Sequence, residues 1–260
     1  MRIATKSRQE IELMRAAGRV VHQTLATCRS AARPGISTAA LDQLALDTFT
    51  SLGAVGLFKN YPTYQPGQGF PGNTCISVND EVVHGIPGPR ILRDGDVVSI
   101  DCGIRLDGWC GDSAVTVPVG NISPEATKLI SVSEETLALA IELIRPHIRW
   151  SDIARRMQEH VEKNGFSCVR EFVGHGIGRR MHEEPKVPNF VSREFLNRDD
   201  FYLEPGMTLA VEPMVIIGGS AVVVLDDGWT VVSKDKTFAA HVEHTLAVTA
   251  TGCEILTNGQ

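Results

Sequence analysis

The stretch that decides the fold runs from Asp94 to Val117 and reads DGDVVSIDCGIRLDGWCGDSAVTV. It consists of two runs rich in Val and Ile on either side of an Asp107-Gly108 turn signal. Such runs around an Asp-Gly pair are typical of a β-hairpin. The hairpin carries one acid in each strand, Asp101 in the first and Asp112 in the second.

The register of this hairpin decides how the two acids meet. If the loop residues are Leu106-Asp107, Asp101 faces Asp112 directly. If they are Asp107-Gly108, Asp101 faces Ala114, and Asp112 is its diagonal neighbour on the same face. Both registers place the carboxylates side by side, which is costly among apolar neighbours unless a cation lies between them. The pair is therefore either the solvent-facing side of an edge hairpin or part of a metal site.

The composition is that of an ordinary globular protein, with 260 residues, 43% of them hydrophobic and 22% charged. The formal net charge of −6 provides no basic footprint, so sequence-specific nucleic-acid binding is not expected. No secretory signal and no run long enough to span a membrane is present in the sequence. The six cysteines form no C-x-x-C pair and no zinc-finger spacing, which indicates free thiols. We expect a cytoplasmic protein with no membrane partner.

Helix signals alternate with strand signals along the chain. Four helices are predicted. The first begins after Ser7, which forms a capping box with Glu10, and the second begins after Ser37 or Thr38 and ends near Gly53. The third runs from Ser123-Pro124 to Arg145-Pro146, and the fourth begins after the N-cap Ser151 and ends at Gly165. The chain beyond Gly165 is predicted to be β-like, with a loop from Pro185 to Pro205. This mixture predicts an α+β fold.

The two halves of the chain repeat the same order of features. Val83-His84-Gly85-Ile86 corresponds to Gly174-His175-Gly176-Ile177, and DGDVVSID, which ends at Asp101, corresponds to PGMTLAVE, which ends at Glu212. An ordered series of this kind indicates a duplicated α+β unit. We therefore predict a single catalytic domain over residues 1–260 with pseudo-repeat halves at about 7–120 and 121–250, whose strand acids meet at one central site.

Four acids and one histidine are the candidate metal ligands: Asp101, Asp112, His175, Glu212 and Glu243. Each of the acids lies within a predicted strand, where an acid is more commonly a satisfied surface residue. Their linkage through the repeat favours the ligand interpretation. An oxygen-rich set with one imidazole suits a pair of first-row divalent ions better than a cysteine-type structural zinc.

Three further histidines need a separate interpretation. His182 lies seven residues after His175, and the glycines between them argue against a helix. In an extended backbone this separation places the two side chains on opposite faces, so we expect them not to share one role. His241 and His244 are predicted to be structural rather than ligands.

At this point the motifs HGIP, DGDVVSID, GDSA, GHGIGRRMHEEP, LEPGMTLAVEP and HVEHT resemble those of type I methionine aminopeptidases, in the same order and from about Lys6 to about Thr249. The resemblance implies the pita-bread α+β fold, with two pseudo-symmetric halves around two divalent ions (cobalt, manganese, iron or zinc). It implies that Asp101 and Asp112 hold one ion and that Asp112, His175, Glu212 and Glu243 hold the other, with Asp112 and Glu243 bridging.

The activity that the resemblance implies is hydrolytic removal of the initiator methionine from nascent proteins and peptides, with a preference for a small second residue. A water acidified by the two ions would attack the first carbonyl. Glu212 would accept the proton, His182 would stabilise the oxyanion, and His84 would contact the scissile amide. The implied partners are nascent N-termini at the ribosome, and the chain is expected to be a monomer.

The resemblance also implies an apolar, sulfur-lined pocket for the methionine side chain, formed by Phe70, Cys75, Met181 and Trp229. Two features depart from the family pattern. The residue before His182 is commonly Phe but is Met181 here, and residues 64–68, where the family often carries a Tyr, read Tyr-Gln-Pro-Gly-Gln.

Relatives of the same fold provide the alternatives. Proline-specific aminopeptidases and prolidases usually carry an N-terminal domain, whereas the capping box here begins at Ser7. Type II methionine aminopeptidases carry a helical insertion where this chain has only the 185–205 loop. Non-catalytic binding relatives lose ligands, whereas this chain keeps every matched one. A metalloaminopeptidase is therefore the expectation.

Overall fold

A curved nine-stranded antiparallel sheet organises the fold, and the computed structural model describes residues 3–62 and 69–260. The strands along the sheet are β1 (Val55–Gly56), β4 (Val97–Leu106), β5 (Trp109–Pro118), β14 (Glu243–Val248), β9 (Thr208–Val211), β7 (Gly174–Gly176) and β8 (Glu183–Val187). In addition, β2 (Cys75–Val78) pairs with β4, and β15 (Cys253–Ile255) pairs with β14. The central strand β14 therefore joins β5 to β9, two strands that are far apart in the sequence.

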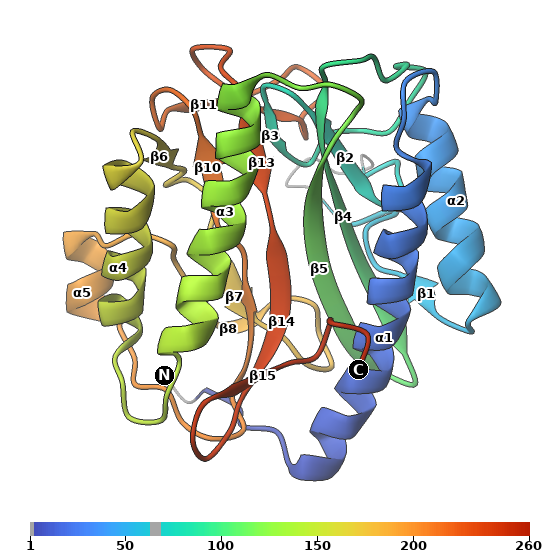
Figure 1. Ribbon diagram of the computed structural model, residues 1–260. Helices are drawn as coiled ribbons and strands as arrows, with labels where there is room; N and C mark the ends of the chain where they lie inside the picture. The colour runs from blue at the N-terminus through green and yellow to red at the C-terminus, as the bar shows by residue number, and fades with distance from the viewer. Residues whose placement is uncertain (1–2, 63–68) are drawn as a thin grey trace.

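Two three-stranded sheets accompany the large one. The first has the order β13 (Ala239–His241), β10 (Met214–Ile216) and β6 (Ser167–Cys168). The second has the order β11 (Val222–Val224), β12 (Val231–Ser233) and β3 (Glu81–Val83). Both lie in the upper part of the view in Figure 1.

The helices are α1 (Arg8–Ala31), α2 (Thr38–Ser51), α3 (Pro124–Leu143), α4 (Trp150–Lys163) and α5 (Arg193–Arg198). The predicted capping box at Ser7 and Glu10 is confirmed, and Ser37 is the cap of α2. The prediction of Ser151 as an N-cap is wrong. Helix α4 begins at Trp150 with Arg149 as its N-cap, and the Ser151 hydroxyl donates a hydrogen bond to Asp200 at 2.8 Å. Helix α5 lies within the stretch that we predicted to be a loop.

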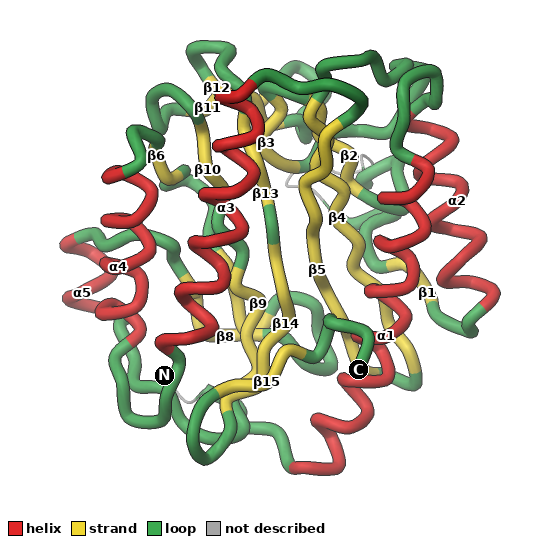
Figure 2. The backbone as a smooth tube through the Cα atoms, viewed as in Figure 1, coloured by secondary structure: helices red, strands yellow, loops and turns green. Residues whose placement is uncertain are grey.

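The helices cover one side of the large sheet. Figures 1 and 2 show α1 and α3 on either side of β5 and β14, with α2 beside α1 and α4 beside α3. Side chains such as Cys102 and Ile100 of β4 pack beneath α1 and α2 in one apolar core, and α3 and α4 pack over β9 and β14 in another. Because side chains alternate along a strand, Asp101 of β4 points to the opposite, helix-free side. The division into halves at about residue 120 stays a prediction.

The hairpin of β4 and β5 has the second of the two predicted registers. Asp101 lies opposite Ala114, and the loop consists of Asp107 and Gly108. Both loop residues have positive φ values, +50° and +80°, as a type I′ turn requires. The turn thereby fixes Asp112 as the diagonal neighbour of Asp101.

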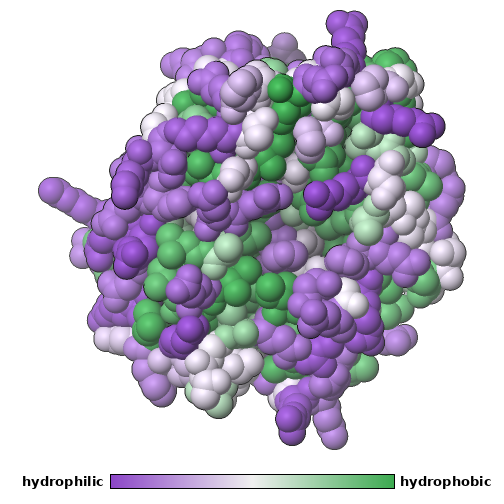
Figure 3. Space-filling view, viewed as in Figure 1, coloured by the Kyte–Doolittle hydropathy of each residue, from purple (hydrophilic) through white to green (hydrophobic). Residues whose placement is uncertain are grey.

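The surface on the helix side is mainly hydrophilic, with apolar side chains gathered left of and below its centre (Figure 3). The amphipathic helix α1 turns its apolar side, including Met14, Val21 and Leu25, to the interior. Within the described residues, no helix combines the length and the apolar character needed to cross a bilayer.

Candidate metal centre

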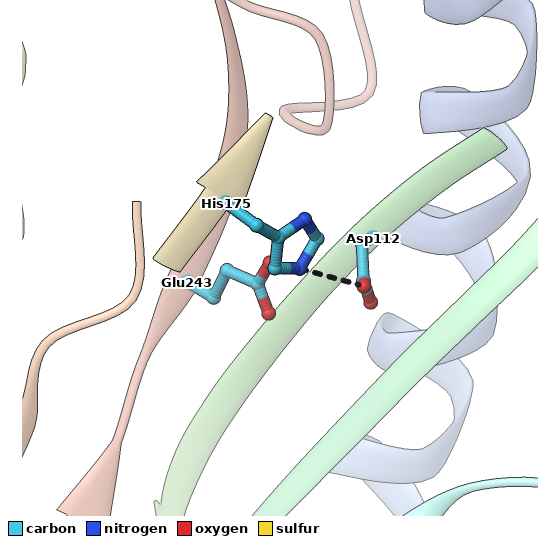
Figure 4. Close-up of side chains that lie close together, drawn as sticks. All are labelled: Asp112, His175 and Glu243. Carbon is cyan, nitrogen blue, oxygen red and sulfur yellow. Dashed lines mark ion pairs between the residues drawn. The ribbon is translucent and has the colours of Figure 1, made fainter. Parts of the chain in front are cut away.

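Acidic and imidazole side chains meet in a cavity of about 230 Å³. Asp112 of β5, His175 of β7 and Glu243 of β14 point toward one another (Figure 4), and one ligand atom from each lies within 4.8 Å of the others. Asp101 and Glu212 line the same cavity. The five ligands predicted from the sequence therefore lie around one space, although they come from segments more than 140 residues apart.

The carboxylates of this cavity lack the partners that buried charges need. One oxygen each of Asp101, Asp112 and Glu243 is buried without a hydrogen bond. Burial and the neighbouring carboxylates raise the pKa of Asp101 and of Glu243 well above their ordinary values. Burial also raises the pKa of Asp112 to about 6, with His175 opposing the shift. Buried carboxylates with free oxygens are a donor set that fits divalent cations.

His175 presents its free nitrogen to these acids. Its Nδ1 lies 2.9 Å from the carbonyl oxygen of Gly176, so Nδ1 carries the proton and donates to that oxygen. The other ring nitrogen, Nε2, lies 3.9 Å from Asp112 Oδ2 and 3.7 Å from Glu212 Oε1. A backbone carbonyl that holds the other ring nitrogen is the usual support of a metal-binding histidine.

Glu212 follows β9 and differs from the other acids. Burial raises its pKa, but the hydrogen bond and charge of His241, together with His175 and His182, outweigh burial, so the pKa of Glu212 is lowered. His241 Nε2 lies 3.4 Å from Glu212 Oε2. Asn189 donates to the backbone carbonyl of Glu212 at 2.9 Å. Glu212 is therefore ionised at neutral pH and held from two sides.

His241 is a site residue that the sequence did not identify as one. We predicted it to be structural, yet it lines the cavity and is only 3% exposed. Its backbone N–H donates to Thr116 Oγ1 at 3.0 Å, and Thr116 donates back to its carbonyl oxygen at 2.7 Å. The H-V-E-H-T spacing contains the signal, because an extended strand places His241 and Glu243 on one face.

His182 lies beside His175, contrary to the expectation that the two would face apart. Their ring centroids are 4.3 Å apart. The chain reverses between β7 and β8, so an argument from continuous extended backbone does not apply. The hydroxyl of Tyr61 lies 2.6 Å from His182 Nδ1, and burial lowers the pKa of His182 to about 4. At neutral pH His182 is an uncharged hydrogen-bonding group.

His84 stands at another side of the cavity, directly after β3. Its φ of +59° is rare for a residue with a side chain, and such strain is concentrated at functional sites. The His84 ring lies edge-on to Phe172 at 5.4 Å and to Trp229 at 6.4 Å. Burial lowers the pKa of His84 to about 4, so this ring too is neutral at pH 7.

One end of the cavity is apolar and contains sulfur. Phe70, Cys75, Met181 and Trp229, the four residues predicted for the pocket, lie in one cluster together with Phe58. Phe70 and Trp229 make an edge-on ring contact at 5.2 Å. Residues 64–68, where the family often carries a Tyr, lie outside the described residues. Among the residues that the structure describes, Tyr61 lines the cavity.

Comparisons with known proteins agree with this geometry. Residues 12–250 match metallopeptidase family M24. The methionine aminopeptidase of Clostridium perfringens is 49% identical over 98% of this chain and 98% of its own length. Methionine aminopeptidase 1 of Bacillus subtilis is 47% identical over 98% and 99% of the respective chains. The crystal structure of the methionine aminopeptidase from Thermotoga maritima has a TM-score of 0.92 at 41% identity, covering 98% of this chain and 99% of that one.

The fold and the buried ligand cluster, together with these matches, define a metal-dependent peptidase of family M24. Within that family the chain belongs to the methionine aminopeptidases, and it is a metalloaminopeptidase. The prolidase of Pyrococcus furiosus shares the fold alone, with a TM-score of 0.78 at 18% identity over 98% of this chain and 66% of that one. The predicted pita-bread α+β fold is confirmed.

Proposed function

We propose that this chain hydrolyses the bond after an N-terminal methionine in nascent proteins and peptides, with two divalent ions and a preference for a small second residue. The observation that carries the proposal is the cavity itself. Its polar end holds carboxylate oxygens without partners, and its apolar end is lined by aromatic and sulfur-containing side chains. A methionine side chain suits such an apolar end because thioethers contact aromatic rings favourably.

The proposed ligand set is the one expected from the sequence. Asp101 and Asp112 would hold one ion, and Asp112, His175, Glu212 and Glu243 would hold the other, with Asp112 and Glu243 common to both. The short distances among Asp112, His175 and Glu243 support the second site, and the unpartnered buried oxygen of Asp101 supports the first. Cobalt, manganese, iron and zinc all fit ligands of this type.

Divalent ions, when bound, lower the pKa of water and so supply a nucleophile at neutral pH. The protein side chains then divide the remaining tasks. Glu212, ionised because of its lowered pKa, accepts the proton of the nucleophile. His182, neutral at pH 7, donates a hydrogen bond to the oxygen that becomes negative during attack. His84 contacts the scissile amide from its own side of the cavity.

The pocket residues Phe70, Cys75, Met181 and Trp229 exclude water from the methionine side chain. Full burial of such a side chain contributes about 2 kcal/mol to binding. A larger second residue would meet the rings of His84 and Phe172, which lie in edge-on contact. This crowding supports the preference for a small residue at the second position.

In the cell we propose action in the cytoplasm, as a monomer, on N-termini that emerge from the ribosome. The net charge of −6 supports contact through the peptide rather than through sequence-specific nucleic-acid binding. No membrane partner is proposed.

The test uses protein stripped by a chelator, assayed before and after addition of Mn²⁺ or Co²⁺. We expect metal-dependent release of methionine from a Met-Ala-Ser peptide and no cleavage of Ala-Pro-Ala. Glu243→Gln should abolish the response to metal, whereas Glu254→Gln, a change at a surface acid paired with Arg15, should not. Cleavage of Ala-Pro-Ala would assign the chain to proline-specific relatives. Metal binding without cleavage of either peptide would indicate a non-catalytic relative.

A further inference from the structure

A second hollow, of about 520 Å³, opens beside the candidate metal centre. Four side chains line both spaces: Tyr61, His84, Phe172 and Trp229. The second space, here called the outer groove, is completed by residues of the β11–β12 hairpin, including Val224 and Val231. The outer groove is therefore continuous with the place where the scissile bond is proposed to lie.

The wall of the outer groove is a three-stranded sheet that leads away from His84. Val83, the residue before His84, lies opposite Val231 of β12, and Val231 lies opposite Val224 of β11. Neighbouring strands are about 4.8 Å apart, so Val224 is about 10 Å from the β3 backbone. An extended peptide advances about 3.4 Å per residue and covers that distance in about three residues.

Val224 is an apolar side chain at a solvent-exposed position. It lines the outer groove and is 51% exposed. The neighbouring Val223 is 44% exposed and, by strand alternation, points to the other face of the hairpin. Val223, Val224 and Leu225 are consecutive exposed apolar residues, and an apolar patch next to a substrate cavity indicates an interaction surface.

We propose that the outer groove binds an apolar side chain at about the third to fifth residue of the substrate peptide. This inference rests on the proposed function, because it places the downstream part of the same peptide whose first residue occupies the cavity. The continuity of the two spaces and the apolar wall around Val224 select this occupant. An acidic residue at these positions finds no cationic partner among Val224, Val231 and Trp229 and is disfavoured.

The experiment compares Met-Ala-Ser-Leu-Leu with Met-Ala-Ser-Asp-Asp, using the tripeptide Met-Ala-Ser, which is too short to reach Val224, as the reference. We expect the KM of the leucine peptide to be about fivefold below that of the aspartate peptide. This is the gain in affinity that burial of the half-exposed Val224 side chain would produce. Val224→Ser removes the apolar contact without adding a charge, so it should bring the KM values of the leucine and aspartate peptides together relative to the tripeptide. Val223→Ser, on the other face of the same strand, is the matched control and should retain the difference.

The outcomes separate the two proposals. If the wild-type protein releases methionine from none of the three peptides, the proposed function fails. If it cleaves all of them and the leucine and aspartate peptides have equal KM values, the outer groove assignment is wrong and the proposed function stands. Equal effects of Val224→Ser and Val223→Ser would also overturn the assignment. So would a dimer in gel filtration that Val224→Ser dissociates, because the occupant would then be a second copy of the chain.

Discussion

The crowded carboxylates predict that the site destabilises the metal-free protein. Burial raises the pKa of Asp112 from 3.8 to about 6, so ionising this carboxyl is less favourable in the folded state than in the unfolded state. At 1.36 kcal/mol per pKa unit, this difference costs the folded state about 3 kcal/mol at pH 7.5. Asp112→Asn removes the titration and keeps the shape. We therefore expect the variant to be about 3 kcal/mol more stable than the wild type in the presence of a chelator.

The stability difference between Asp112→Asn and the wild type should depend on pH in a defined direction. The advantage of Asp112→Asn is complete above pH 6, falls to about half at pH 5, and is absent below the unfolded pKa of 3.8. Urea unfolding of chelated protein at pH 7.5 and pH 5 measures both values. Asp107→Asn, at an exposed turn position of the same hairpin, is the control and should change neither. A variant that is no more stable than wild type at pH 7.5, or equally stabilised at pH 5, would refute the reasoning.

Substitutions at three further positions test the surroundings of the site. Tyr61→Phe removes the hydroxyl bonded to His182 and should lower kcat about tenfold on Met-Ala-Ser without shifting the unfolding temperature; an unchanged kcat would contradict this role. His241→Leu should lower kcat by at least about tenfold, whereas His241→Gln, which keeps a donor, should retain most activity; equal losses would indicate packing alone. Lys6→Met leaves Glu183, bonded at 2.7 Å, without its cation and should lower the free energy of unfolding by about 2 kcal/mol, measured in urea; a loss below about 0.5 kcal/mol would show that solvent screens the pair.

Local signals in the sequence were sufficient for most of the secondary structure near the site. The Asp107-Gly108 turn predicted the hairpin, and the capping box at Ser7 predicted the start of α1, because both depend on residues a few positions apart. Ser151 was wrongly predicted to be an N-cap because its hydroxyl donates a hydrogen bond to the Asp200 carboxylate, 49 residues away. A long-range partner of this kind leaves no local signature.

The proposed metal ligands could be predicted from the order of the motifs, whereas the contacts of their neighbours could be found only in the structure. Asp101, Asp112, His175, Glu212 and Glu243 each lie in a motif of the resemblance, and the structure places them around one cavity. The contact of His182 with His175 depends on a chain reversal that alternation along one strand cannot reveal. In the same way, the hydrogen bond of Tyr61 joins segments 121 residues apart.

The position of β14 has a consequence for how the protein folds during its synthesis. This strand lies between β5 and β9 in the sheet, yet it follows both in the chain. While the chain is being synthesised, β5 and β9 each lack their shared neighbour, and their pairing edges stay open until β14 arrives. Glu243, the last of the proposed ligands, arrives with it. The protein therefore completes its sheet and its ligand set in one late event, and any factor that protects newly made chains has to shield both edges until then.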